Sequence, residues 1–234
     1  MSTLRIMVFT LLLSLTCLNA IGAEARQDDS REAMEQGTEL FARGQYEMAI
    51  LQYRIALQWP GNHLARAHYN IGVCHYQLGR RQAAISEYRT ALKAAAGKYP
   101  QASFALGVAL KELGELAEAK LAFTQVVELS KGRDAEALFQ LALLLGKEGN
   151  YDDAEKYLRQ AIKNAPRNFS GGHNNLGVLL ALRGRYNEAM SEFNTALKQS
   201  QTSEAADNLK LCRSLVNSFS ASLLASLKTT NQAQ

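Results

Sequence analysis

Residues 176–196 read LGVLLALRGRYNEAMSEFNTA, which predicts two helices joined by a glycine turn. The leucines of the first helix recur at the three- and four-residue spacing of a single helix face. Gly184 stands where a left-handed residue would end that helix, and a second amphipathic run follows over residues 186–196. A helical hairpin of this length buries only one of its sides, so it needs similar neighbours for stability.

The sequence supplies four such neighbours at a constant period of 35 residues. Stepping back from Gly184 by this period reaches a glycine each time, at Gly149, Gly114, Gly79 and Gly44. Small residues lie five positions after and seven positions before these glycines, and bulky residues lie nine positions after them. The small residues are Ala49, Ala84, Ala119, Ala154 and Ala189, then Gly37, Gly72, Gly107, Ala142 and Gly177; the bulky ones are Tyr53, Tyr88, Phe123, Leu158 and Phe193. We therefore expect each bulky side chain to fill the space beside the small residues.

This pattern resembles the tetratricopeptide repeat family, in which helix A carries leucine-glycine and helix B carries tyrosine, alanine and an aromatic residue. The resemblance covers roughly residues 30 to 200 and departs from the family at Arg81, which takes the tyrosine position, and at His75, which takes a core position. A 35-residue period also occurs in pentatricopeptide RNA-binding repeats. The tyrosine-alanine-aromatic run fits the tetratricopeptide pattern better.

The resemblance implies an all-α fold, a right-handed α-solenoid of five tandem helix-turn-helix repeats with a C-terminal capping helix. The expected repeats span about residues 30–64, 65–99, 100–134, 135–169 and 170–203, within an array of residues 26–203. The capping helix is expected at residues 204–228, with Leu209, Leu211, Val216, Phe219 and Leu223 as its apolar positions, and a disordered tail at residues 229–234. A capping helix is needed because the last repeat would otherwise expose its apolar flank.

Residues 1–25 predict a secretory signal peptide. Arg5 gives a positive start, an apolar run follows over residues 6–15, and small residues precede cleavage after Ala23 or Ala25. The run is too short to span a bilayer of about 30 Å as a helix. We therefore expect a periplasmic or secreted protein without an integral span in its mature chain. A lipoprotein attached through Cys17 is the alternative, which Ser14 and Thr16 disfavour because the lipoprotein motif favours leucine and a small residue there.

Charge and cysteine content narrow the classes of partner. The net charge is +4, and the basic residues are scattered among acidic ones, which does not favour nucleic-acid binding. Besides Cys17, the chain has Cys74 and Cys212, almost four repeats apart. A disulfide needs Cα atoms within about 7 Å, so we expect two buried free thiols, with an intermolecular disulfide through Cys212 as the alternative.

The search for catalytic or metal-binding motifs finds none of the usual signatures. His68 and His75 share a helix face next to Cys74, but both occupy positions that pack against helix B, so we do not predict a metal site. We expect neither an enzyme nor a bound cofactor.

Helix A lines the concave groove in arrays of this family, so its residues are the candidate partner-binding positions. They are Met34, Thr38, Phe41, Tyr69, Asn70, Val73, Tyr76, Phe104, Val108, Phe139, Leu143, Asn174 and Asn175. An exposed apolar groove would suit an amphipathic helix or an extended peptide. The alternative interpretation is that the aromatic residues and valines belong to the core between A helices.

Relatives that clamp chaperone C-termini carry lysine, asparagine and arginine at set helix A positions, and this chain matches that set only at Asn70. We therefore interpret Asn70 and Asn175 as donors to backbone or peptide. The resemblance implies an exported scaffold that binds a protein or peptide partner, as an adaptor in bacterial cell-envelope assembly or secretion. The alternative is a periplasmic holding chaperone, which would bind many clients instead of one partner.

Overall fold

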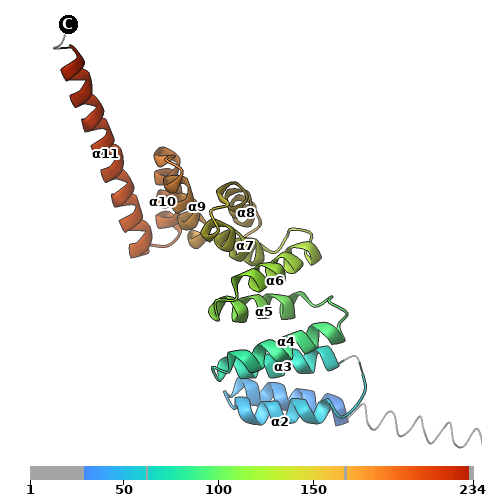
Figure 1. Cartoon of the computed structure of the whole chain (residues 1–234). Helices are drawn as coiled ribbons and strands as arrows, with labels where there is room; N and C mark the ends of the chain where they lie inside the picture. Colours follow the sequence, from blue (N-terminus) through green and yellow to red (C-terminus); the bar gives the residue numbers. More distant parts are fainter. Residues whose placement is uncertain (1–28, 62, 166–167, 232–234) are drawn as a thin grey trace, which may run out of the picture. The chain divides into compact units, whose positions relative to one another are not determined.

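The computed structural model describes residues 29–61, 63–165 and 168–231, and Figure 1 shows helices joined by turns. These residues contain no strand. The predicted all-α fold of tandem helical repeats is therefore confirmed. The predicted signal peptide lies outside the described residues, as do the last three residues of the predicted tail.

The helices follow one another through turns of a few residues. Residues 29–42 form the first helix. The next are α2 (Tyr46–Ala56), α3 (Leu64–Gln77), α4 (Arg81–Ala94), α5 (Pro100–Glu112), α6 (Leu116–Leu129), α7 (Ala135–Lys147), α8 (Tyr151–Asn164), α9 (Ser170–Leu182), α10 (Tyr186–Gln199) and α11 (Ser203–Asn231).

The chain divides within α6 into two compact units, residues 1–119 and residues 120–234. The described part of the first unit holds the helix of residues 29–42, α2 to α5 and the start of α6. The second unit holds the rest of α6 and α7 to α11.

The glycines at the 35-residue period end the first helix of each hairpin. Their φ angles are +74°, +76°, +82°, +80° and +74° from Gly44 to Gly184, a region that glycine enters without steric cost. In the second repeat the backbone N–H of Gly79 donates to the Tyr76 carbonyl (3.0 Å), and that of Arg80 to the His75 carbonyl (2.9 Å). These bonds satisfy carbonyl groups at the helix end and turn the chain into α4.

Close packing of a glycine against an aromatic ring joins the two helices of a repeat. A Cβ atom added to Gly72 would lie 2.6 Å from the Tyr88 ring, and one added to Gly177 would lie 2.6 Å from the Phe193 ring. Tyr88 and Phe193 are almost fully buried. The predicted small-into-large packing is therefore confirmed in these repeats, because any side chain at the glycine would displace the ring.

A carboxylate shared by three arginines connects repeats in the second unit. Glu155 on α8 lies 2.9 Å from Arg159 on the same helix and 2.7 Å from both Arg183 and Arg185 in the α9–α10 turn. Burial acts to raise the pKa of Glu155, but hydrogen bonds from Arg159 and Arg185 outweigh it and hold the pKa below its usual value. The charged carboxylate therefore links α8 to the following hairpin.

The last helix, α11, packs along α10 and extends beyond it (Figure 1). Leu209 and Cys212 are buried, and the Cys212 thiol donates to the carbonyl of Tyr186, the first residue of α10 (3.5 Å). The helix continues to Asn231, three residues past the predicted end at Lys228. No glycine or proline occurs between Ser203 and Asn231, so the sequence contains no residue that forces an earlier stop.

Candidate functional site

The first unit places most of its predicted groove residues at half-buried positions. Thr38 is exposed, and Phe41, Tyr69, Asn70, Val73, Tyr76, Phe104 and Val108 are partly covered. Met34 is only 3% exposed and belongs to the core cluster that contains Ile71 and Cys74. Its assignment to the groove was wrong, because its flexible side chain fills the interior instead.

The aromatic ring of Tyr69 packs against two other tyrosines. Its centroid lies 5.9 Å from that of Tyr88 on α4 and 5.3 Å from that of Tyr99, which precedes α5. Burial raises the pKa of Tyr69. Tyr69 therefore takes part in the packing between the second and third repeats, and only part of its surface is open to a partner.

Tyr76 takes part in a polar contact between the same repeats. Its hydroxyl donates to Glu112 on α5, and Arg81 bonds the same carboxylate while its guanidinium lies 3.9 Å from the Tyr76 ring centroid. The hydrogen bond from Tyr76 holds the pKa of Glu112 below its usual value. Tyr76 is thus fixed by its neighbours, which also cover part of the predicted groove.

Two polar groove residues of the first unit, Thr38 and Asn70, interact with Tyr53, the buried tyrosine of the first repeat. The Tyr53 hydroxyl donates to Thr38 Oγ1 (3.4 Å), and Asn70 also hydrogen-bonds the Tyr53 side chain. Phe41 packs on Tyr46 at the hairpin turn, with ring centroids 5.3 Å apart. The predicted role of Asn70 as a donor to backbone or peptide stays a prediction.

In the second unit, Phe139 and Leu143 on α7 are half-buried. The Phe139 ring packs edge-on against Phe169, which precedes α9, with centroids 5.3 Å apart. Asn175 donates to the Gly171 carbonyl (2.8 Å), in agreement with its predicted role as a backbone donor. Phe139, Leu143 and Asn175 are therefore only partly exposed.

Asn174 is 5% exposed because α11 covers it. Its side-chain amide donates to Glu204 Oε1 (3.1 Å), and its side-chain oxygen accepts from Asn208 Nδ2 (3.0 Å). The assignment of Asn174 to the groove was therefore wrong, since both its donor and its acceptor are satisfied by the capping helix.

Beyond these hydrogen bonds, α9 and α11 form an apolar surface that we call the α9–α11 strip: Val178, Leu182, Leu211 and Leu215. On α11, Leu211 and Leu215 lie three and seven positions after Asn208. On α9, Val178 and Leu182 lie four and eight positions after Asn174. Each pair thus continues the helix side that carries the hydrogen bonds. The exposed fractions of Leu182, Leu211 and Leu215 are 66%, 61% and 37%.

The two helices run in the same direction, which brings the two halves of the strip together. The intervening helix α10 connects α9 to α11 through short turns and is antiparallel to both. Along both α9 and α11, the hydrogen-bonded asparagine therefore comes first and the apolar residues follow it in the same direction. The strip thus consists of an apolar side of α9 and one of α11, and hydrogen-bonded amides join the two helices at one end.

Sequence reasoning missed this strip. Leu182 was not selected because it lies after the last helix A position that the groove argument used. Leu211 was assigned to the apolar face of the capping helix, whereas only Leu209 and Cys212 of that region are buried. The available signal was the spacing of Glu204, Asn208, Leu211 and Leu215, which marks a second side of α11 that differs from the buried one.

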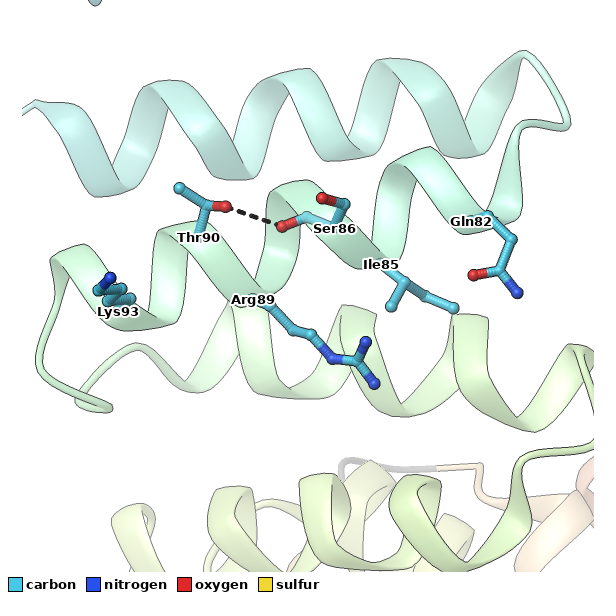
Figure 2. Close-up of a pocket in the computed structure, with 6 residues that line it drawn as sticks. All are labelled: Gln82, Ile85, Ser86, Arg89, Thr90 and Lys93. Atoms are coloured by element: carbon cyan, nitrogen blue, oxygen red, sulfur yellow. Dashed lines mark hydrogen bonds between the residues drawn. The ribbon is translucent and has the colours of Figure 1, made fainter.

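A hollow on the outer face of α4 does not resemble a ligand site. All of its lining residues come from this helix, as Figure 2 shows: Gln82, Ile85, Ser86, Arg89, Thr90 and Lys93. The Thr90 hydroxyl donates to the Ser86 carbonyl (2.9 Å), and Arg89 extends away from α4 to pair with Glu118 at 2.6 Å. A hollow lined by one helix encloses little of a ligand, and the arginine of this hollow already has a partner.

Two histidines pair with a glutamate on the other helix of their repeat. His68 Nδ1 lies 2.7 Å from Glu87 Oε2, and His173 Nδ1 lies 2.7 Å from Glu192 Oε2, so the same pair joins helices A and B in two repeats. Burial raises the pKa of the Cys74 thiol to about 11, which keeps it protonated at neutral pH. Among the described residues, no three His, Cys, Asp or Glu side chains gather as a metal site.

Cys212 is likewise a buried free thiol, so the predicted pair of buried thiols is confirmed. No helix within the described ranges is both long and apolar enough to cross a membrane.

Comparison with solved structures gives several similar folds. YrrB, described as a repeat protein with an unusual peptide-binding site, is 22% identical, with a TM-score of 0.67 over 82% of this chain and 96% of that one. A tetratricopeptide repeat protein from Parabacteroides merdae is 20% identical, with a TM-score of 0.68 over 87% and 80% of the two chains. PilF from Pseudomonas aeruginosa is 18% identical, with a TM-score of 0.63 over 80% and 90%. At these identities the likeness concerns the fold alone.

A search of curated proteins gives no match. The tetratricopeptide repeat family model matches residues 34–102, 79–134, 104–169 and 139–204, which together cover most of the chain. The matched segments agree with the periodic glycine turns and the glycine–aromatic packing described above. The chain belongs to the tetratricopeptide repeat family, whose fold serves as a scaffold for protein–protein interaction.

Proposed function

We propose that this protein is an exported scaffold that binds an amphipathic helix of a protein partner on the α9–α11 strip. The observation that carries the proposal is the exposure of Leu182 and Leu211, at 66% and 61%, on adjacent helices. Leu143 occupies on α7 the repeat position that Val178 occupies on α9, so the apolar lining continues onto the preceding repeat. Leucines arranged in this way accept apolar anchors spaced by about one helical turn.

The acidic residues at one end of the strip indicate that the partner helix carries a basic residue there. The strip itself carries no charged residue, whereas the exposed acids Glu204 and Asp207 lie at its amide end. A partner helix with three leucine-like anchors and a lysine or arginine over these acids would match both features. The basic residue would fix the direction in which the helix binds.

A labelled synthetic helix of this design, with leucine anchors and a terminal lysine pair, tests the site by fluorescence anisotropy. We expect Leu182→Glu and Leu211→Glu each to weaken binding more than tenfold, because a buried interface anchor contributes about 2 kcal/mol and about 1.4 kcal/mol is a factor of ten. Leu121→Glu is the matched control, since Leu121 is a 68% exposed leucine on α6. Equal binding by wild-type protein and both strip variants would contradict the proposal.

The cellular role that we propose is that of an adaptor in bacterial cell-envelope assembly or secretion. The leader-like pattern of residues 1–25 supports export, because its charged start, apolar run and small residues match a secretory signal. Sequencing the N-terminus of protein recovered from the exporting cell tests this role. A start at Glu24 or Arg26 is expected, whereas a lipid-modified Cys17 or an intact leader would contradict cleavage there.

A holding chaperone for exported chains is the second candidate, because exposed leucines also suit apolar segments of unfolded proteins. Crosslinking in the exporting cell from a photoreactive residue at position 182 separates the two. An adaptor gives one stoichiometric product that is lost in Leu211→Glu. A chaperone gives many products and suppresses aggregation of a reduced, unfolded test protein, which would replace the adaptor proposal.

A further inference from the structure

The first repeat carries an apolar stripe on the outer face of its second helix, α2. Met48, Leu51 and Ile55 are spaced three and four residues apart, so they share one side of the helix. Their exposed fractions are 50%, 51% and 41%. The opposite side of α2 carries the buried residues Ala49, Ile50, Tyr53 and Ala56. The helix is therefore apolar on the side away from its repeat as well as on the side that packs.

The stripe is specific to the first repeat. The positions equivalent to Met48 hold Ala83, Glu118, Asp153 and Glu188. Those equivalent to Ile55 hold threonine or glutamine, and those equivalent to Leu51 hold serine, leucine, lysine and serine. The repeat architecture does not require apolar residues at these positions. Their presence on α2 alone indicates that this face has a role that the other repeats lack.

The charges beside the stripe are self-complementary. Glu47 and Arg54 are exposed and lie seven residues apart on the same flank of the stripe. Two α2 helices that pack antiparallel with their stripes facing would bring each Glu47 next to the Arg54 of the other copy. A two-fold axis repeats this pair on both ends, which is the arrangement of an isologous dimer. On the other flank the stripe is bordered by Gln52, which is neutral.

We infer that the α2 stripe is a docking surface for a second copy of this chain, in an antiparallel α2–α2 contact. Glu47 already accepts a hydrogen bond from Arg80 (2.5 Å), which holds the pKa of Glu47 below its usual value, so the arginine of the second copy would share this charged carboxylate with Arg80. The surface is independent of the α9–α11 strip, so the dimer would display two partner-binding sites. Two linked sites raise the avidity for a partner that repeats its own binding segment.

Sedimentation velocity of the purified chain tests this inference. A contact of three helical turns belongs to the weak class of interfaces, below about 1,200 Å² in total, so protein concentrations should reach about 1 mM. We expect a monomer–dimer equilibrium in which Leu51→Glu combined with Ile55→Glu raises the dissociation constant more than tenfold. Leu121→Glu, at the equivalent position of the third repeat, should leave it unchanged.

Charge reversal tests the antiparallel arrangement. Arg54→Glu alone places Glu47 against a glutamate, and Glu47→Arg alone places Arg54 against an arginine, so each variant should dimerise more weakly than wild type. An equimolar mixture of the two variants should form a mixed dimer, because both contacts then join opposite charges. Thermal melts of each variant check that loss of the Glu47–Arg80 pair has not unfolded the first repeat.

A wild-type chain that stays monomeric at the highest concentration would overturn the inference. So would a dimer that tolerates Leu51→Glu with Ile55→Glu, since that dimer uses another surface. A dimer that is broken by these two substitutions but gains nothing in the charge-reversed mixture would overturn the antiparallel arrangement. Binding of the synthetic helix to the strip does not depend on any of these outcomes, so this inference and the proposed function can fail separately.

Discussion

The second repeat (α3–α4) and the fifth repeat (α9–α10) are built on the same framework. Each has a glycine pressed against an aromatic ring, Gly72 with Tyr88 and Gly177 with Phe193. Each has a histidine–glutamate pair between its two helices at 2.7 Å. In these two repeats, the packing within the hairpin and the polar bond between its helices involve no residue of a neighbouring repeat.

The differences between the two repeats include a polar residue at one core position and the covering of the inner face. His75 in α3 occupies the position that Leu180 occupies in α9, and the two are 9% and 0% exposed. The inner face of α3 is partly covered by Tyr99 and Glu112, whereas Leu182 of α9 remains exposed. The exposure of the inner face, which depends on the neighbouring repeat, thus varies between the two repeats. The glycine–aromatic packing, which depends on the hairpin alone, does not.

The largest expected effect is the loss of the aromatic ring that fills the hairpin. Phe193→Ala and Tyr88→Ala should each lower the free energy of unfolding by about 3 to 5 kcal/mol, because the ring leaves a cavity that the helices cannot easily close. Urea denaturation followed by circular dichroism measures the change. Leu121→Ala is the control, since that side chain is exposed and its truncation creates no cavity.

Similar losses in the second and fifth repeats would support a common framework. A loss in only one of them would show that the neighbouring repeats, and not the hairpin, determine the energy of this packing. Because arrays can unfold one repeat at a time, hydrogen exchange of α4 and α10 amides should accompany the denaturation curves.

A smaller effect is expected from adding one methyl group at the packed glycines. Gly72→Ala and Gly177→Ala should each cost about 1 to 3 kcal/mol, because the new Cβ would lie 2.6 Å from an aromatic carbon and force the ring to move. Thermal melts of the two variants provide the comparison. Gly171→Ala is a matched control on α9, since its added Cβ has no neighbour within 4 Å. A control as unstable as Gly177→Ala would contradict the steric explanation.

The elements that the sequence predicted are those encoded by local spacing. The glycine turns recur at every period, and the burial of Tyr88 and Phe193 and the contact of His68 with helix B depend on residues within one hairpin. Met34 and Asn174 were placed incorrectly because their burial depends on the next helix in the array, which a periodic pattern does not reveal. Phe139 could not be assigned from its position alone either, since its packing requires Phe169 at the start of the following repeat.

The smallest expected effect concerns stability at mildly acidic pH and separates His75 from Leu180. The imidazole of His75 is buried, and its Nδ1 atom has no hydrogen-bond partner within the described part of the chain. Burial lowers the pKa of His75, with Arg80 and Arg54 acting in the same direction and Glu87 and Glu47 opposing them. The folded state therefore favours the neutral ring more than the unfolded state does.

The sign of the effect follows from proton binding. At pH values above 6.5, the ordinary pKa of a histidine side chain, the ring is neutral in both states and its stabilising contribution is complete. As the pH falls below 6.5 toward the lower folded pKa, the unfolded state binds a proton first and the folded state loses stability. For one group the slope cannot exceed about 1.4 kcal/mol per pH unit.

His75→Leu gives the second repeat the residue of the fifth and removes this titration. We expect the variant to be at least as stable as wild type at pH 8, since it buries no unpaired nitrogen, and its advantage should grow between pH 7 and pH 5. Leu180→His is the reciprocal change and should create an acid-sensitive fifth repeat. The other three histidines are unchanged in all three proteins, so the comparison of unfolding midpoints concerns positions 75 and 180. An advantage of His75→Leu that stays constant from pH 8 to pH 5 would show that His75 is not held neutral in the folded state, and the contrast with Leu180 would then be one of packing alone.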